Sequence, residues 1–166
     1  MKKLLCLLGT ITLIGTSTTS LVACNTPQEY TLKELAKLKE ENKIHTDNQE
    51  IKDNLEWIAP QEKPFNTVDN KYYYVVWRGD KNDKWKNINF NYNFNDTKKI
   101  DKDNSFILYI TAIKKLQIWN ETNKNWTEWS NDKNKIQYKS VYRWSLDTNE
   151  PGLILDENSN VKINRE

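Results

Sequence analysis

The spacing of the apolar residues changes near Lys71, and this change constrains the fold more than any other feature of the chain. From Ile88 to Phe94 every second residue is apolar, and asparagines fill the positions between. Such alternation puts the apolar side chains on one face of a β-strand and the amides on the other. Before Lys71 the apolar residues recur after three and four positions, as in an amphipathic helix. The sequence therefore predicts an α+β fold, a helical part followed by a mostly antiparallel β-sheet domain.

The first predicted helix begins at Thr31, within a helical segment placed at residues 31–60. Thr31 and Glu34 have the spacing of a capping box, in which each side chain accepts a hydrogen bond from the backbone of the other. Tyr30 and Leu35 have the spacing of a hydrophobic staple beside it. We expect a helix with a narrow apolar stripe.

A second helix is predicted after the capping pattern Asp47 to Glu50. Three apolar residues then follow on one helical face: Ile51, Leu55 and Ile58. Pro60 cannot continue a helix and should end this one near Ala59. Since neither apolar stripe is wide, the helices should stand as a stalk or lie along a sheet rather than form a bundle.

Residues 61–166 are predicted to form the β domain, with six or seven strands around a single core. The links between the apolar runs are too short for crossovers, so the strands should be mostly antiparallel. Phe106 to Ile113 is apolar on both faces and the alternation continues to Trp119, which predicts one long central strand. Other strands are expected near 72–78 and 136–146, with a short terminal hairpin from Leu153 to Asn164.

The first 23 residues have the parts of a signal peptide that precedes a lipidated cysteine. Its basic, apolar and small-residue regions are Lys2-Lys3, Leu4–Leu21 and Val22-Ala23. Cleavage between Ala23 and Cys24 would free the thiol of Cys24 for a diacylglycerol anchor, followed by a tether at residues 24–30. Each buried methylene of such an anchor contributes about 0.8 kcal/mol.

An uncleaved signal anchor and ordinary secretion are the alternatives to lipidation. The apolar run has 18 residues, near the lower limit of roughly 17 for a membrane span, and its second half is hydroxylic. These features favour cleavage and acylation. The mature chain is then expected on the outer face of the cell membrane, held there by its lipid.

The signal from Met1 to Asn25 resembles those of lipoproteins from wall-less bacteria of the spiroplasma and mycoplasma group. The abundance of Lys and Asn and the scarcity of Gly and Pro are similar to the composition of the same proteins. Tyr138–Trp144 and the turn after it are similar to segments of plectrovirus-related membrane proteins of these bacteria, a family without an assigned activity. The resemblance implies a surface lipoprotein and no particular mechanism.

Composition disfavours several functional classes. Loss of the signal removes two of the 25 basic residues, which leaves 23 against 23 acidic ones, and such a neutral, mixed surface does not suit nucleic acid. Cys6 leaves with the signal and Cys24 carries the lipid, so no thiol remains for a disulfide. His45 is the single histidine, too few for the usual zinc sites. Gly79 and Gly152 alone cannot build a glycine-rich phosphate loop. We therefore expect no cofactor and no metal.

Several polar residues have weak catalytic or metal-binding interpretations. His45 could orient Ser105 or Ser140 only if its linker folded over the sheet, so a solvated surface histidine is expected. The segments 101–105 and 156–160 begin like calcium loops but lack the Gly and the Glu that complete one. Both segments are predicted to be turns.

Four acidic residues and one tripeptide allow two further functional interpretations. Paired carboxylates for glycoside hydrolysis could come from Glu121, Glu128, Asp132 and Glu150, although the sequence fixes no distance between them. Arg78-Gly79-Asp80 matches the tripeptide that integrins recognise, and it follows a strand where a loop is expected. A Gly-Asp pair is also an ordinary turn.

The tryptophans give the strongest indication of binding. Trp119 and Trp126 flank a polar loop and should pair across a hairpin. With Trp129 and Trp144 they form a candidate binding set, because exposed aromatic clusters stack on sugars or anchor protein partners; packing against the helices is the alternative. We expect a non-catalytic binding or adhesion module for a host-surface protein or glycan. An extracellular carboxylate-dependent hydrolase and a structural coat protein are the alternatives, and the oligomeric state is open.

Overall fold

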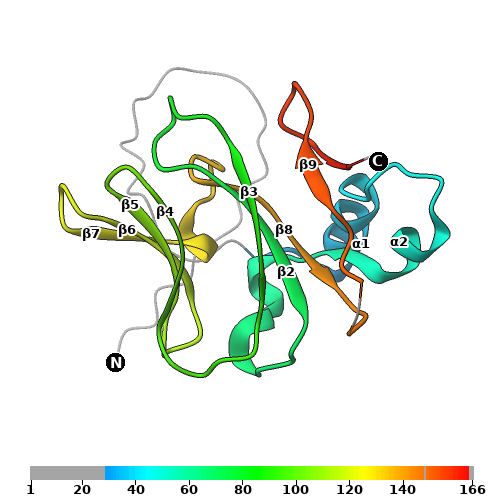
Figure 1. Cartoon of the computed structure of the whole chain (residues 1–166), viewed down its shortest axis with the longest axis horizontal. Helices are drawn as coiled ribbons and strands as arrows, with labels where there is room; N and C mark the ends of the chain where they lie inside the picture. Colours follow the sequence, from blue (N-terminus) through cyan, green and yellow to red (C-terminus); the bar gives the residue numbers. More distant parts are fainter. Residues whose placement is uncertain (1–28, 148, 165–166) are drawn as a thin grey trace, which may run out of the picture.

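A computed structural model describes residues 29–147 and 149–164 of the chain. The signal peptide, its cleavage site and Cys24 lie outside the described residues. The described part is α+β, with two α-helices, three short 3-10 helices and ten strands (Figure 1). Every strand pair is antiparallel. The predicted class and strand direction are confirmed. The predicted number of strands, six or seven, is too low.

Helix α1, Leu32–Glu41, begins where the sequence predicts. The amide of Glu34 donates to Oγ1 of Thr31 at 3.3 Å, and the amide of Thr31 donates to Oε2 of Glu34 at 2.8 Å, which completes the capping box. Leu35 and Leu38 pack against the β structure, and the hydroxyl of Tyr142 donates to the carbonyl of Asn42, just after the helix, at 3.1 Å. Helix α1 thus lies along a sheet, and a separate helical stalk is not confirmed.

Helix α2, Gln49–Asn54, is shorter than predicted. Asn48 rather than Asp47 caps it, since the amide of Ile51 donates to Oδ1 of Asn48 at 3.3 Å. Strand β1, Leu55–Trp57, follows at once and pairs with strand β8. The predicted helix to Ala59 is therefore wrong. In the extended conformation residues 55 and 57 pair with a neighbouring strand and become buried. The stabilisation from this pairing and burial exceeds that of a helix supported by only three apolar residues.

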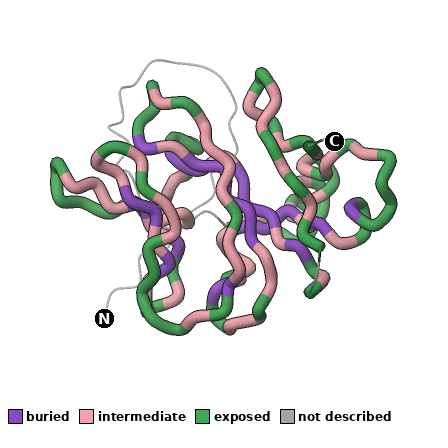
Figure 2. The backbone as a smooth tube through the Cα atoms, viewed as in Figure 1, coloured by how far each residue is buried: buried purple, intermediate pink, exposed green. Residues whose placement is uncertain are grey.

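The first sheet is centred on β2. Its strands, in the order β1-β8-β2-β3, are Leu55–Trp57, Tyr138–Trp144, Tyr72–Trp77 and Lys86–Asn91. Tyr73, Val75 and Trp77 face one apolar cluster, whereas Tyr74 faces another. Strand β2 is therefore covered on both faces, and buried residues follow it through the middle of the fold (Figure 2). It occupies the central position predicted for residues 106–119.

The second sheet contains a turn that the sequence did not indicate. Its strands, in the order β4-β5-β6-β7, are Lys98–Asp103, Phe106–Ile110, Leu116–Asn120 and Asn125–Glu128. The amide of Thr111 donates to the carbonyl of Lys115 at 2.9 Å, and Lys114 has a φ of 64°. The single long strand is thus wrong: β5 and β6 form a hairpin. Gly or Asn usually takes such a left-handed position, and here the residue is a lysine.

The C-terminal hairpin is confirmed. Strands β9, Leu153–Leu155, and β10, Val161–Ile163, form a two-stranded sheet beside β3. Nδ2 of Asn87 in β3 donates to the carbonyl of Leu153 at 2.8 Å. The amide face of β3, predicted to be solvated, is thus partly covered, while Ile88 and Phe90 pack on the opposite side as expected.

Two apolar clusters replace the predicted single core. The first fills the space between the two four-stranded sheets, where Leu108, Ile110 and Ile118 meet β2. The second lies on the other face of the first sheet, under α1, α2 and the C-terminal hairpin. This two-sided burial fixes which strand faces remain open to solvent. The outer face of the second sheet is one of them.

Candidate functional site

The predicted set of tryptophans does not form one surface. Trp144 has only 1% of its surface exposed and belongs to the second cluster, because strand β8 lies between β1 and β2. Trp129 is partly buried against the first cluster and lines a cleft described below, apart from Trp119 and Trp126. The prediction that all four tryptophans bind a partner is therefore wrong for Trp144.

Trp119 and Trp126 do lie together, as predicted. They are register partners in β6 and β7, with ring centroids 4.9 Å apart. The ring of Tyr109 in β5 lies 5.6 Å from that of Trp126 in an edge-on arrangement. We call Tyr109, Trp119 and Trp126 the aromatic face. Aromatic pairs at these distances hold each other in place.

The aromatic face lies on the side of the second sheet away from the first core. Leu108 and Ile118 are register partners and point into that core, so the neighbouring residues in each strand point outward. Trp126 has 48% of its surface exposed on β7, whose only partner in the described chain is β6. The three rings therefore lie outside the first core, with Trp126 exposed and Tyr109 and Trp119 half-buried beside it.

Ion pairs lie at the two ends of strand β6, which carries Trp119. Nζ of Lys102 lies 2.7 Å from Oε2 of Glu121. Nζ of Lys115 lies 2.7 Å from Oε2 of Glu128, and Ser130 donates to the other oxygen of that carboxylate at 2.5 Å. An apolar centre with a polar rim is the usual arrangement of a recognition surface.

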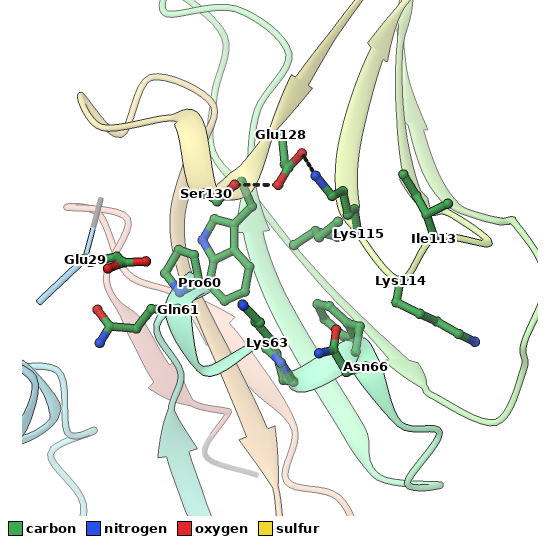
Figure 3. A pocket seen from close by; sticks show the side chains of 14 residues that line it. Glu29, Pro60, Gln61, Lys63, Asn66, Ile113, Lys114, Lys115, Glu128 and Ser130 are labelled. Carbon is green, nitrogen blue, oxygen red and sulfur yellow. Dashed lines mark hydrogen bonds and ion pairs between the residues drawn. The ribbon is translucent and has the colours of Figure 1, made fainter. Parts of the chain in front are cut away.

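A cleft of about 420 Å³ lies at the end of the second sheet where Glu128 and Lys115 pair (Figure 3). Its apolar lining comes from Pro60, Pro64, Phe65, Ile113, Leu116 and Trp129. Burial alone would raise the pKa of Glu128, but hydrogen bonds from Lys115 and Ser130 outweigh it and hold the pKa below its ordinary value of 4.5. That carboxylate is ionised at neutral pH and already paired.

This cleft could not be predicted from the sequence. It is built from residue 29, residues 60–66, the turn at 113–116 and residues 128–130. Lys63 holds a left-handed backbone conformation, with φ of 49°, between the 3-10 helices Pro60–Glu62 and Pro64–Asn66. The third 3-10 helix, Trp129–Asn131, forms another wall. Pro60 and Pro64 mark breaks in the chain, but no local pattern shows that these segments meet.

Arg78-Gly79-Asp80 does not form an extended exposed loop. The guanidinium of Arg78 lies 4.2 Å from the ring centre of Trp85, and its Nε donates to a backbone carbonyl at 2.6 Å. Gly79 is buried beneath Phe106, and only Asp80 is exposed. The arginine and the aspartate are thus not presented together, and the tripeptide serves as a turn.

Three of the four candidate carboxylates have local structural partners. The four candidates were Glu121, Glu128, Asp132 and Glu150. Glu121 and Glu128 form ion pairs with Lys102 and Lys115. Asp132 accepts hydrogen bonds from three successive backbone amides, residues 136–138, at 2.8 to 2.9 Å, while Glu150 lines a separate hollow beside β3. A glycosidase needs one carboxyl with a raised pKa, and the pKa of Glu128 is lowered.

The remaining polar candidates have simple positions. His45 is exposed, as predicted, and it lines a hollow of about 530 Å³ together with Ser140; no hydrogen bond joins the two among the described residues. Asn104, with φ of 50°, turns the chain between β4 and β5, and Asp156 accepts from the amides of Asn158 and Asn160 in the β9–β10 turn. The predicted turn at 156–160 is confirmed, whereas that at 101–105 is confirmed only for Asn104 and Ser105, because residues 101–103 belong to β4. Within residues 29–147 and 149–164, no group of three or more His, Cys, Asp or Glu could hold a metal.

Comparisons of the chain with models of protein families, with curated proteins and with solved structures found no match. In the described part of the chain, no helix is both long and apolar enough to pass through a bilayer. The function is therefore inferred from the aromatic face, the cleft and Cys24.

Proposed function

We propose that this chain is a surface lipoprotein of a wall-less bacterium whose β domain binds a partner outside the cell and catalyses no reaction. The support for the anchor is the signal sequence that ends in Leu21-Val22-Ala23-Cys24. Acyl chains on the thiol of Cys24 would hold the mature chain on the outer face of the membrane.

The observation that carries the binding proposal is the aromatic face. Burying three rings against a partner would remove a large apolar area from water, and Trp and Tyr dominate the energetics of such contacts. The rings already lie in contact, so little side-chain freedom is lost on binding. The paired charges around them can hydrogen-bond to a protein or to sugar hydroxyls. The partner is therefore a host-surface protein or glycan.

The test of binding uses recombinant residues 25–166 and two matched tryptophan variants. The chain is applied to host-cell extracts and to a glycan array, and the affinity of any captured partner is measured. Trp126→Ala should weaken that affinity about tenfold or more, because truncation of a hot-spot aromatic costs at least about 1–2 kcal/mol. Trp85→Ala removes a tryptophan outside the aromatic face and should leave the affinity unchanged. Equal effects of the two substitutions would contradict the proposed face.

A test of the anchor is independent of the partner. Cys24→Ser should prevent lipidation and processing, and the chain should then leave the membrane fraction or accumulate as an unprocessed precursor. Globomycin, which blocks lipoprotein signal peptidase, should likewise stop processing of the unsubstituted chain. A Cys24→Ser chain with normal processing and membrane retention would refute the anchor.

A structural coat protein is the second candidate. Strand β7 is an edge strand that carries the exposed Trp126, and unpaired strand edges can join copies of a chain. Self-association of the purified domain, measured by light scattering, would favour this alternative. No specific geometry favours the hydrolase, since Glu121, Glu128 and Asp132 are engaged in ion pairs or backbone hydrogen bonds and Glu150 lines a separate hollow.

A further inference from the structure

The chain enters the described domain beside the cleft. Glu29, the first described residue, lines the cleft, and only four residues separate it from Cys24. A polypeptide spans at most about 3.6 Å per residue, so the Cα atom of Glu29 lies within about 18 Å of that of Cys24. Acyl chains on Cys24 would keep that cysteine at the bilayer surface, so the inference below rests on the proposed anchor.

This reach is short compared with the domain. A compact chain of about 135 residues has a radius of gyration of about 14 Å, which corresponds to a width of roughly 35 Å. The side of the domain that carries Glu29 must therefore stay near the membrane, while the opposite side cannot reach it. The cleft belongs to the membrane-proximal side.

Two exposed aliphatic residues are linked to the cleft, Ile113 as part of its lining and Leu32 through its place in the chain just after Glu29. Leu32 and Ile113 are the most exposed large hydrophobic residues in the described chain, at 86% and 68%. Leu32 lies three residues after Glu29, and Ile113 lies across the cleft from Glu29 at the tip of the β5–β6 turn (Figure 3). Such side chains are unfavourable in water and favourable at the boundary between lipid headgroups and acyl chains.

Lys63 and Lys114, which line the cleft with Ile113, have no acidic partner among the described residues. Nζ of Lys63 has no ion pair or hydrogen bond within the described residues. Nζ of Lys114 donates to the carbonyl and Oδ1 of Asn95, each at 3.0 Å, and lies 5.9 Å from the ring centre of Tyr92; in Figure 3 it points away from the cleft. Among the described residues no carboxylate neutralises either ammonium group, so both charges can attract a phosphate. Lys115, by contrast, is neutralised by Glu128.

We propose that this side of the domain docks on the membrane that holds its own anchor. Ile113 and Leu32 enter the headgroup region, and Lys63 and Lys114 contact phosphates of anionic lipids. The lipid on Cys24 and this surface then form two linked attachments, which fix the orientation of the domain. The β6–β7 loop, Asn120–Asn125, lies at the other end of strand β6 from Ile113, so the aromatic face extends away from the contact.

Single-cysteine labelling of the lipidated protein tests the docking. The mature chain has no thiol once Cys24 is acylated, so Ile113→Cys, Leu32→Cys and Asn123→Cys each introduce one site. Each variant is labelled with an environment-sensitive fluorophore and placed in mixed phosphatidylcholine and phosphatidylglycerol vesicles with a quencher on the acyl chains. Residues 113, 32 and 123 are all exposed, so none of the changes should disturb the core.

Quenching is expected at positions 113 and 32 and not at position 123, the matched control on the β6–β7 loop. Position 113 quenched no more than position 123 would overturn the docking. Lys63→Glu in the Ile113→Cys background should reduce quenching, and an unchanged signal would refute the role of Lys63. Failure of the anchor is recognised separately: the unsubstituted protein would take up the label at Cys24 and would not sediment with vesicles.

Discussion

A Cβ atom on Gly79 would lie 2.4 Å from Cδ2 of Phe106, so the ring of Phe106 occupies the space that any side chain at position 79 would need. The contact joins the loop after β2 to the first residue of β5. It also makes the glycine of Arg78-Gly79-Asp80 a packing residue rather than the flexible centre of a recognition loop.

Gly79→Ala should therefore destabilise the domain. Overpacking of this kind costs about 1–3 kcal/mol. Gly152→Ala is the matched control, because its Cβ would meet only Asn164 Cβ at 3.6 Å, an ordinary contact, and its stability should be equal to or slightly above that of the unsubstituted chain. The free energy of unfolding in urea checks both, and equal values for the two variants would refute the packing of Gly79.

Trp144 and Trp126 should respond oppositely to truncation. Trp144→Ala empties a fully buried site and should cost about 3–5 kcal/mol of stability. Trp126→Ala should cost under about 1 kcal/mol, because that ring lies at the surface, and should instead weaken partner binding. Denaturant unfolding measures the first effect. A large loss of stability in Trp126→Ala would show that the aromatic face serves the fold.

Glu128 should contribute to acid sensitivity. Its pKa is below the ordinary 4.5 in the folded chain, so its stabilising contribution is present above pH 4.5 and is lost as the pH falls through the lower, folded-state value. Glu128→Gln should reduce stability at neutral pH and flatten the decline in acid. Unfolding free energies measured from neutral pH to below 4.5 test this, and parallel curves for both proteins would contradict it.

The N-cap of α1 should hold the first turn of that helix. Thr31→Ala removes the acceptor of the Glu34 amide and should cost about 1 kcal/mol. Amide hydrogen exchange should speed up in α1 and remain unchanged in β2, which is central and buried. Unchanged exchange in α1 would mean that its contacts with the sheet, such as the ion pair of Lys39 with Glu56 in β1, hold the helix without the cap.

Local features of the fold were predictable from sequence. The capping box at Thr31 and the pairing of Trp119 with Trp126 depend on residues close in the chain, and the structure confirms both. Strand β1 was not predictable, because Leu55 pairs with Trp144, 89 positions away in the chain. The β5–β6 turn was not predictable because Lys114 takes a left-handed conformation that Gly or Asn usually adopts.

The same contrast between local and long-range contacts applies to the candidate site. The Trp119–Trp126 pair follows from one hairpin, whereas the burial of Trp144 depends on the position of β8 between two distant strands. The cleft joins residue 29, residues 60–66, the 113–116 turn and residues 128–130. Only the tertiary arrangement brings these segments together.

The most direct test of membrane attachment is the mass of the N-terminal peptide from the native protein. Mass spectrometry should find a peptide that begins at Cys24 and carries a diacylglycerol group on its sulfur. A peptide with an unmodified Cys24, or one that extends back into residues 1–23, would contradict the anchored surface protein proposed for this chain.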